Sequence, residues 1–154
     1  MKTLFPVVLL VAALASCHEK TELDRRFDEE LAVQTTDEGR KCVTFSHRRA
    51  VAFNEHRESF DPSDGIDEFE AWVLADEYRL RVYGVCGATR VPEFTDGRWR
   101  VVVVVGDPPP RAQPPIYIDA KSGRLQQIGC EPIDRPAEWL KNPRPPNSEG
   151  RVTR

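Results

Sequence analysis

Three groups of side chains in this sequence could do chemistry: four cysteines, three histidines and a run of carboxylates within residues 67–77. The histidines, His18, His47 and His56, do not have the spacing of zinc ligands. The sequence also contains no nucleophile elbow, phosphate-binding loop or dinucleotide-binding motif. We therefore predict that the protein is not an enzyme, and we expect no catalytic residue, no metal site and no cofactor.

The first cysteine, Cys17, closes an N-terminal segment that has the features of an export signal. Lys2 supplies a positive charge, and residues 4–14 form an apolar run of eleven residues. A helix of that length spans about 16 Å, roughly half of a bilayer core, which is too short for a comfortable membrane span. The segment therefore predicts a cleaved signal rather than a membrane-spanning helix.

The sequence LASC at residues 14–17 resembles the lipobox of bacterial lipoproteins. In that family the chain is cut before the cysteine, whose thiol and new amino group then carry acyl chains such as palmitate. The resemblance implies a signal peptide at 1–16 and a lipid anchor at Cys17. The alternative is a plain secretory signal that contains a cysteine. Because His18 is not the aspartate that often retains lipoproteins in the inner membrane, the resemblance favours the periplasmic face of the outer membrane.

The composition after residue 16 suits one domain with a modest core. Removing Lys2 with the signal leaves 21 basic and 25 acidic residues, a net charge of −4. The two signs are mixed along the chain, so we expect no nucleic-acid partner. We predict a polar tether at 17–26, a single domain at 27–141, and a disordered tail at 142–154, where proline and polar residues dominate.

The clearest predicted element is a helix that begins near Asp61 and ends at Gly84. Asp61 is a good N-cap, Pro62 suits the first helical position, and glycine commonly ends a helix. At 100° per residue, one face of this helix is apolar. That face contains Ile66, Phe69, Trp72, Val73, Leu80 and Tyr83.

The carboxylates of this helix divide into two kinds. Four lie mostly off the apolar face, which predicts a solvated surface rather than an acid–base pair: Asp67, Glu68, Glu70 and Glu77. Glu77 and Arg81 are four residues apart and can form an ion pair on the helix surface. Asp76 instead projects within the apolar face, where an unpaired carboxylate would be costly. We expect Asp76 to form a structural salt bridge, and the alternative is a place in a binding pocket.

Elsewhere the pattern predicts mainly strands. Residues 41–47 alternate between apolar and polar, which favours a strand with 49–53 as a possible partner, whereas 27–34 fits either a helix or a strand. Asp96-Gly97 predicts a hairpin turn. The strand after it, 99–105, holds five consecutive valines and is apolar on both faces. The helix can cover one face, so the N-terminal segment, a partner or a second copy should cover the other.

A proline-rich segment follows, with five prolines in residues 106–115. We expect a stiff surface loop that cannot join a sheet. Its polar residues Asp107, Arg111 and Gln113 are candidate binding residues. After the loop, 116–119 and 125–128 flank a second predicted hairpin turn at 120–123.

With Cys17 acylated, three cysteines remain, Cys42, Cys86 and Cys130, in a compartment that permits disulfides. Counting strand registers across the two hairpins places Val105 near Ile116 and brings Cys86 and Cys130 to the same end of the sheet. We therefore predict a Cys86–Cys130 bridge with Cys42 free, and a bridge that uses Cys42 is the alternative.

These elements predict an α+β fold in which a long helix packs on a curved antiparallel sheet. Residues 96–129 resemble the C-terminal half of small bacterial immunity proteins with a fold like nuclear transport factor two. The shared features are the turn at Asp96-Gly97, a tryptophan in the next strand, and the Ile118-Asp119-x-x-x-Gly123 turn. One departure is that the loop before the last hairpin contains Gln113-Pro114-Pro115 where the family often has glycines.

The resemblance implies a membrane-anchored periplasmic protein that binds and neutralises a toxin by occlusion. The contact surfaces would be the proline-rich loop and the sheet face that the helix leaves uncovered. The same Asp-x-x-x-Gly turn is common in PepSY domains, so an envelope regulator or protease inhibitor is the alternative. A structural envelope lipoprotein is a third possibility.

Overall fold

The computed structural model describes residues 20–55, 62–84, 86–106, 109–134 and 139. Within these residues the chain has three α-helices, one 3-10 turn and two antiparallel sheets, which confirms the predicted α+β class. The helices are α1 (Glu22–Val33), α2 (Asp37–Glu55) and α3 (Glu68–Val82), with the turn η1 (Pro62–Asp64) before α3. The strands are β1 (Gly87–Thr89), β2 (Glu93–Thr95), β3 (Arg98–Val101), β4 (Val103–Val105), β5 (Arg111–Ala112), β6 (Ile116–Asp119) and β7 (Leu125–Gln127).

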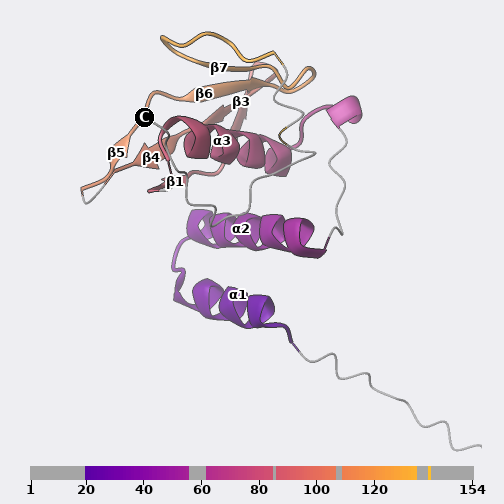
Figure 1. Ribbon diagram of the computed structural model, residues 1–154, viewed down its shortest axis with the longest axis vertical. Coiled ribbons are helices and arrows are strands. Elements are labelled where there is room, and N and C mark those ends of the chain that lie inside the picture. The colour runs from indigo at the N-terminus through magenta and orange to yellow at the C-terminus, as the bar shows by residue number, and fades with distance from the viewer. Residues whose placement is uncertain (1–19, 56–61, 85, 107–108, 135–138, 140–154) are drawn as a thin grey trace, which may run out of the picture.

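The helices and sheets are stacked in layers, with α1 at one end and the four-stranded sheet at the other (Figure 1). Helix α3 lies between α2 and the sheets, so it has a protein neighbour on both sides. All of residues 69–79 are consequently buried, including the charged ones. The expected division of this helix into an apolar face and a solvated face is therefore wrong.

Helix α3 begins later than predicted. Its N-cap is Asp67, whose side chain accepts from the Glu70 backbone N–H at 2.7 Å, while the Glu70 carboxylate accepts from the Asp67 N–H at 3.0 Å. Pro62 belongs to η1, and Gly65 at φ 106° separates that turn from the helix. Asp61 lies outside the described residues. The predicted end is confirmed, because Gly84 follows the C-cap with a positive φ of 87°.

Residues 41–47 are helical, so the predicted strand there is wrong, as is the pairing with 49–53. Phe45, Arg49 and Ala52 are all buried and recur at helical spacing along α2. Residues 27–34, which fitted either element, lie largely in α1. Helix α1 starts at Glu22 with a capping box at Thr21, so five residues assigned to the tether are helical.

The first hairpin turns at Asp96-Gly97, as predicted, with φ values of 49° and 75° that suit a two-residue turn. Its two strands bend in the middle and contribute to both sheets. Residues 90–92 face only residues 101–102 between the pairs Thr89↔Val103 and Glu93↔Arg100, which is a β-bulge. Pro92 falls within this bulge, where its missing N–H does no harm.

The hairpin of β6 and β7 is also confirmed, with Ile116 opposite Gln127 as the register count predicted. Val101 lies opposite Ile116, however, and Val105 pairs with Arg111 in β5. The proline-rich segment therefore does join a sheet, at Arg111 and Ala112, two of the three residues between its prolines. Pairing at 111–112 is possible because neither residue is a proline.

The inner faces of the sheets pack on α3. Val101 and Val103 are fully buried there, together with Ile116 and Ile118 from β6. Val102, Val104 and Val105 are only partly buried. One face of the valine strand is thus covered by the helix, as expected, whereas the described chain covers the other face only in part.

Gly87 should be the glycine least tolerant of substitution in the first hairpin. Its φ is 149°, and an added Cβ would lie 2.3 Å from the Val104 carbonyl oxygen. We expect Gly87→Ala to lower the free energy of unfolding by about 2–3 kcal/mol. Gly97→Ala is the matched control, because its φ is also positive but its Cβ would meet nothing within 4 Å. Urea unfolding should show a loss of about 1 kcal/mol for the control, and equal losses would contradict the steric argument.

Candidate functional site

Asp76 is buried between α2, α3 and β1, and it has three partners. It forms an ion pair with Arg49 of α2, and Arg79 Nη2 lies 2.7 Å from Oδ1. The Thr89 hydroxyl donates to the same oxygen at 2.7 Å. The predicted structural salt bridge is therefore confirmed, and Arg49 is the partner that the sequence did not identify.

Glu77 completes the cluster and is fully buried. The same Arg49 guanidinium pairs with its Oε1, and Arg81 Nη2 lies 3.5 Å from its Oε2, which confirms the predicted i,i+4 pair. Glu70 is also buried, and this burial raises the pKa of its carboxyl. The prediction that these carboxylates are solvated is thus wrong for Glu70 and Glu77, because α2 covers that side of α3.

A pocket of about 390 Å³ adjoins the cluster. Trp72 and Asp76 line it, together with Thr89 and Cys42, whereas Tyr83 points elsewhere and donates to Gln127 Oε1 at 2.9 Å. At the core of the cluster, the two guanidinium groups of Arg49 and Arg79 balance the charges of the Asp76 and Glu77 carboxylates. This arrangement suits a structural link between α2 and α3 better than acid–base chemistry.

The three described cysteines are free thiols, so the expected Cys86–Cys130 bridge is not formed in this structure. The register count assumed one continuous sheet, whereas the chain after Cys86 enters the three-stranded sheet and the chain before Cys130 leaves the four-stranded one. Cys42 is partly buried and donates to the Thr89 carbonyl at 3.6 Å. Burial raises the pKa of its thiol, which opposes its reactivity.

The other predicted binding residues do not come together with Asp76. Arg111 is exposed on β5, and Gln113 follows it with its backbone N–H donating to the Val103 carbonyl at 2.9 Å. Asp107 and the predicted anchor residue Cys17 lie outside the described residues. The proline-rich segment therefore does not join Asp76 in one site within the described chain.

The outer face of the sheets, which α3 leaves uncovered, is a second candidate site. On the four-stranded sheet this face is polar, because the outward residues of neighbouring strands form the row Glu93–Arg100–Tyr117–Gln126. On the three-stranded sheet the corresponding row is small and apolar: Ala88, Val104 and Ala112. The same strand pair thus carries an apolar patch beside a polar one.

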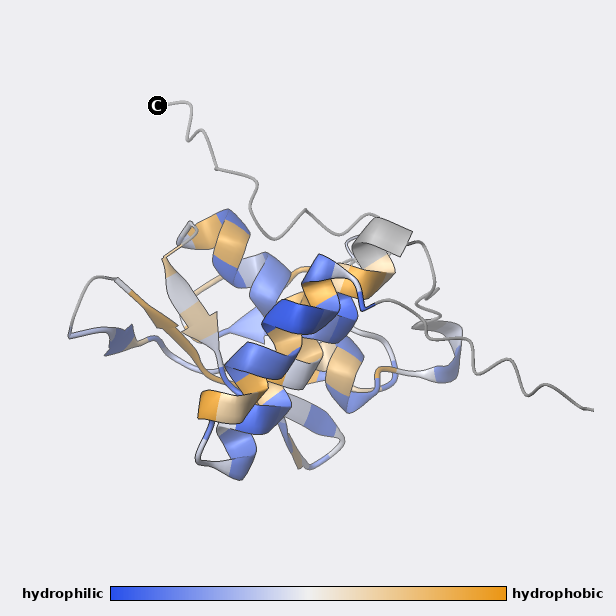
Figure 2. Cartoon of the chain, turned by 90° about the horizontal axis from the view of Figure 1, so that it is seen from below, coloured by the Kyte–Doolittle hydropathy of each residue, from blue (hydrophilic) through white to orange (hydrophobic). Residues whose placement is uncertain are grey.

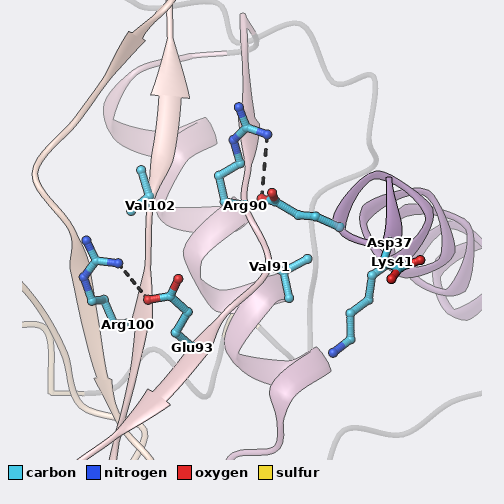
Figure 3. Close-up of a pocket in the computed structure, with 8 residues that line it drawn as sticks. Asp37, Lys41, Arg90, Val91, Glu93, Arg100 and Val102 are labelled. Atoms are coloured by element: carbon cyan, nitrogen blue, oxygen red, sulfur yellow. Dashed lines mark hydrogen bonds and ion pairs between the residues drawn. The ribbon is translucent and has the colours of Figure 1, made fainter. Parts of the chain in front are cut away.

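A pocket of about 570 Å³ lies at the bulge between these two rows (Figure 3). Val91 and Val102 supply its apolar lining, and the first turn of α2 forms the opposite wall. Three acidic and three basic residues also line it: Asp37, Glu38, Glu93, Lys41, Arg90 and Arg100.

Two ion pairs hold the charged walls of this pocket in place. Arg100 Nη1 lies 2.9 Å from Glu93 Oε2, and Arg90 Nη1 lies 3.7 Å from Glu38 Oε1. A third cation, Lys41, is paired with Glu68 of α3. An apolar floor with a paired polar rim is typical of a surface that binds another protein. The sequence indicated an uncovered sheet face, but not which residues form it.

No known protein family, curated protein or solved structure matches this chain. Among the described residues, none of the helices is long and apolar enough to span a membrane. The same residues contain no group of three or more histidines, cysteines and carboxylates that could hold a metal ion.

Proposed function

We propose that this chain is a lipid-anchored, protein-binding module of the cell envelope, of the immunity type that neutralises a toxin by occlusion. The observation that carries the proposal is the uncovered outer sheet face, with the patch Ala88–Val104–Ala112 beside arginine and tyrosine side chains. Arginine and tyrosine are enriched among the residues that dominate protein–protein binding. The N-terminal lipobox resemblance supplies the anchor.

The short segment between the proposed anchor and α1 supports a definite orientation on the membrane. Helix α1 carries five acidic and two basic residues and lies at the end of the molecule opposite the four-stranded sheet. Figure 2 views the molecule from the α1 side and shows this helix as mainly hydrophilic. Only residues 18–20 separate Cys17 from the N-cap Thr21, so an anchor at Cys17 keeps α1 near the lipid. The four-stranded sheet then lies farther from the membrane, within reach of a partner.

Capture of a partner by the full-length, tagged protein in its native envelope, with competing cells present, tests this proposal. We expect Val104→Glu to reduce the recovered partner more than about tenfold, because the change places a charge in the apolar patch. The matched control is Val33→Glu, since Val33 is 72% exposed on α1. Equal recovery with wild type and Val104→Glu would contradict the proposed surface.

The identity of the captured protein separates the candidate functions. A toxic enzyme delivered by a competitor supports the immunity role. An envelope protease or sensor supports the PepSY-like regulator instead. If the wild-type protein recovers no partner, the binding proposal fails and a structural envelope lipoprotein remains.

A further inference from the structure

The outer face contains a small pocket with an excess of hydrogen-bond donors, about 220 Å³ in volume. It lies at the end of the four-stranded sheet away from the bulge. Its lining residues come from β3, β6, β7 and the β6–β7 turn, and they are Arg98, Tyr117, Asp119, Ser122, Arg124 and Gln126. We call these six residues the arginine socket.

Three donor side chains of the socket form no hydrogen bond within the described part of the chain, although Arg98 also interacts electrostatically with Asp119, its cross-strand neighbour. These are the Arg98 guanidinium, the Tyr117 hydroxyl and the Gln126 amide, for which the described residues offer no hydrogen bond or ion pair. Arg124 forms an ion pair with Asp134 at 2.9 Å. This ion pair is weak, because the two side chains are 55% and 74% exposed. The socket therefore retains the capacity to donate to a ligand.

The only acid in the socket is already satisfied from within the chain. Asp119 Oδ1 accepts from the Ser122 N–H at 2.7 Å and from the Ser122 hydroxyl at 2.8 Å. The Lys121 N–H donates to the same oxygen at 3.1 Å. The bonds from Ser122 are the main reason that the pKa of Asp119 is lowered. With two arginines and one aspartate, the socket has a net charge of +1 although the whole chain is at −3.

We infer that the arginine socket binds a carboxylate of the protein partner, an aspartate or glutamate side chain held against Arg98 and Arg124. The inference rests on the proposed function, since it names the chemistry of the partner that docks on the same face. The argument for a carboxylate ligand is charge complementarity, because guanidinium groups form directed, charge-assisted hydrogen bonds with carboxylates. Arg98 is two residues from Arg100 on the same strand face, so one partner surface can cover both the socket and the bulge pocket.

The partner-capture experiment tests this inference with two further variants. We expect the double variant Arg98→Glu, Arg124→Glu to recover less than about one tenth of the partner, because it sets like charges against each other. Arg25→Glu on the exposed side of α1 is the matched control and should recover as much as wild type. If Val104→Glu abolishes capture but the socket variant does not, the inference is wrong and the proposed function stands. If neither variant affects capture, both the socket and the proposed binding surface are wrong.

A defined probe gives a second, independent readout. Two peptides of the same length, one alternating glycine with glutamate and the other glycine with glutamine, are titrated into isotope-labelled protein carrying Cys17→Ser. We expect the glutamate peptide alone to shift the backbone signals of Tyr117 and Gln126, and the shifts to disappear in the socket variant. Equal shifts with both peptides would overturn the assignment.

Discussion

Arg49→Met should lower the free energy of unfolding by about 3–5 kcal/mol, the largest loss of stability that we expect from any single substitution. The arginine is 3% exposed and pairs with both Asp76 and Glu77, which come from adjacent positions of α3. Its removal leaves these two carboxylates buried and under-compensated, and Arg79 and Arg81 can neutralise them only in part. Denaturant unfolding followed by circular dichroism measures the loss.

Two further variants separate this effect from a general effect of changing α2. Arg40→Met alters the same helix at an exposed arginine and should change the stability by less than about 0.5 kcal/mol. Adding Glu77→Gln to Arg49→Met removes one of the stranded charges, so the double variant should recover about 1–2 kcal/mol of the loss. A simple addition of the two single effects would contradict the idea that these residues act as one cluster.

The same cluster explains what the sequence could and could not predict about the helices. Helix α3 has a strong local signal, and Asp76 could be recognised as a residue in need of a partner. The burial of Glu77 depends on a second layer of protein, which no local pattern of α3 reveals. That layer is α2, whose apolar and polar alternation around Val43 and Phe45 is short enough to fit a strand. Because Arg49 belongs to the mispredicted segment, its pairing with Asp76 could not be anticipated.

The sheets show the same contrast between local and long-range information. The turn at Asp96-Gly97 and the hairpin of β6 and β7 are determined by residues close in sequence, and both were predicted. The bulge at 90–92 depends on how two strands match across the hairpin. It decides which side chains surround the pocket in Figure 3 and splits one hairpin between two sheets. The uncovered face could therefore be expected from the valine-rich strand, but its residues could not be assigned.

Cys17→Ser is expected to move the protein from the membrane fraction to the soluble fraction, the largest change in distribution that we predict. A single acyl chain binds a bilayer only reversibly, whereas two or three chains hold firmly, since each buried methylene contributes about 0.8 kcal/mol. Loss of all the chains should thus reduce membrane partitioning by more than about a hundredfold. Fractionation of cells after a high-salt wash measures the distribution, and mass spectrometry of the mature protein detects the acyl groups.

The control for this experiment is Cys130→Ser, since Cys130 is exposed and lies far along the chain from the predicted anchor. That variant should remain with the membrane. If the Cys17→Ser protein stays in the membrane fraction, or the wild-type protein carries no acyl chain, the prediction of a lipid anchor is wrong.

The proposed anchor and the proposed binding face can also be tested separately, because α1 and the four-stranded sheet lie at opposite ends of the molecule. A Cys17→Ser protein should therefore still bind the purified partner with wild-type affinity while failing to protect the cell, because it is no longer held where the partner arrives.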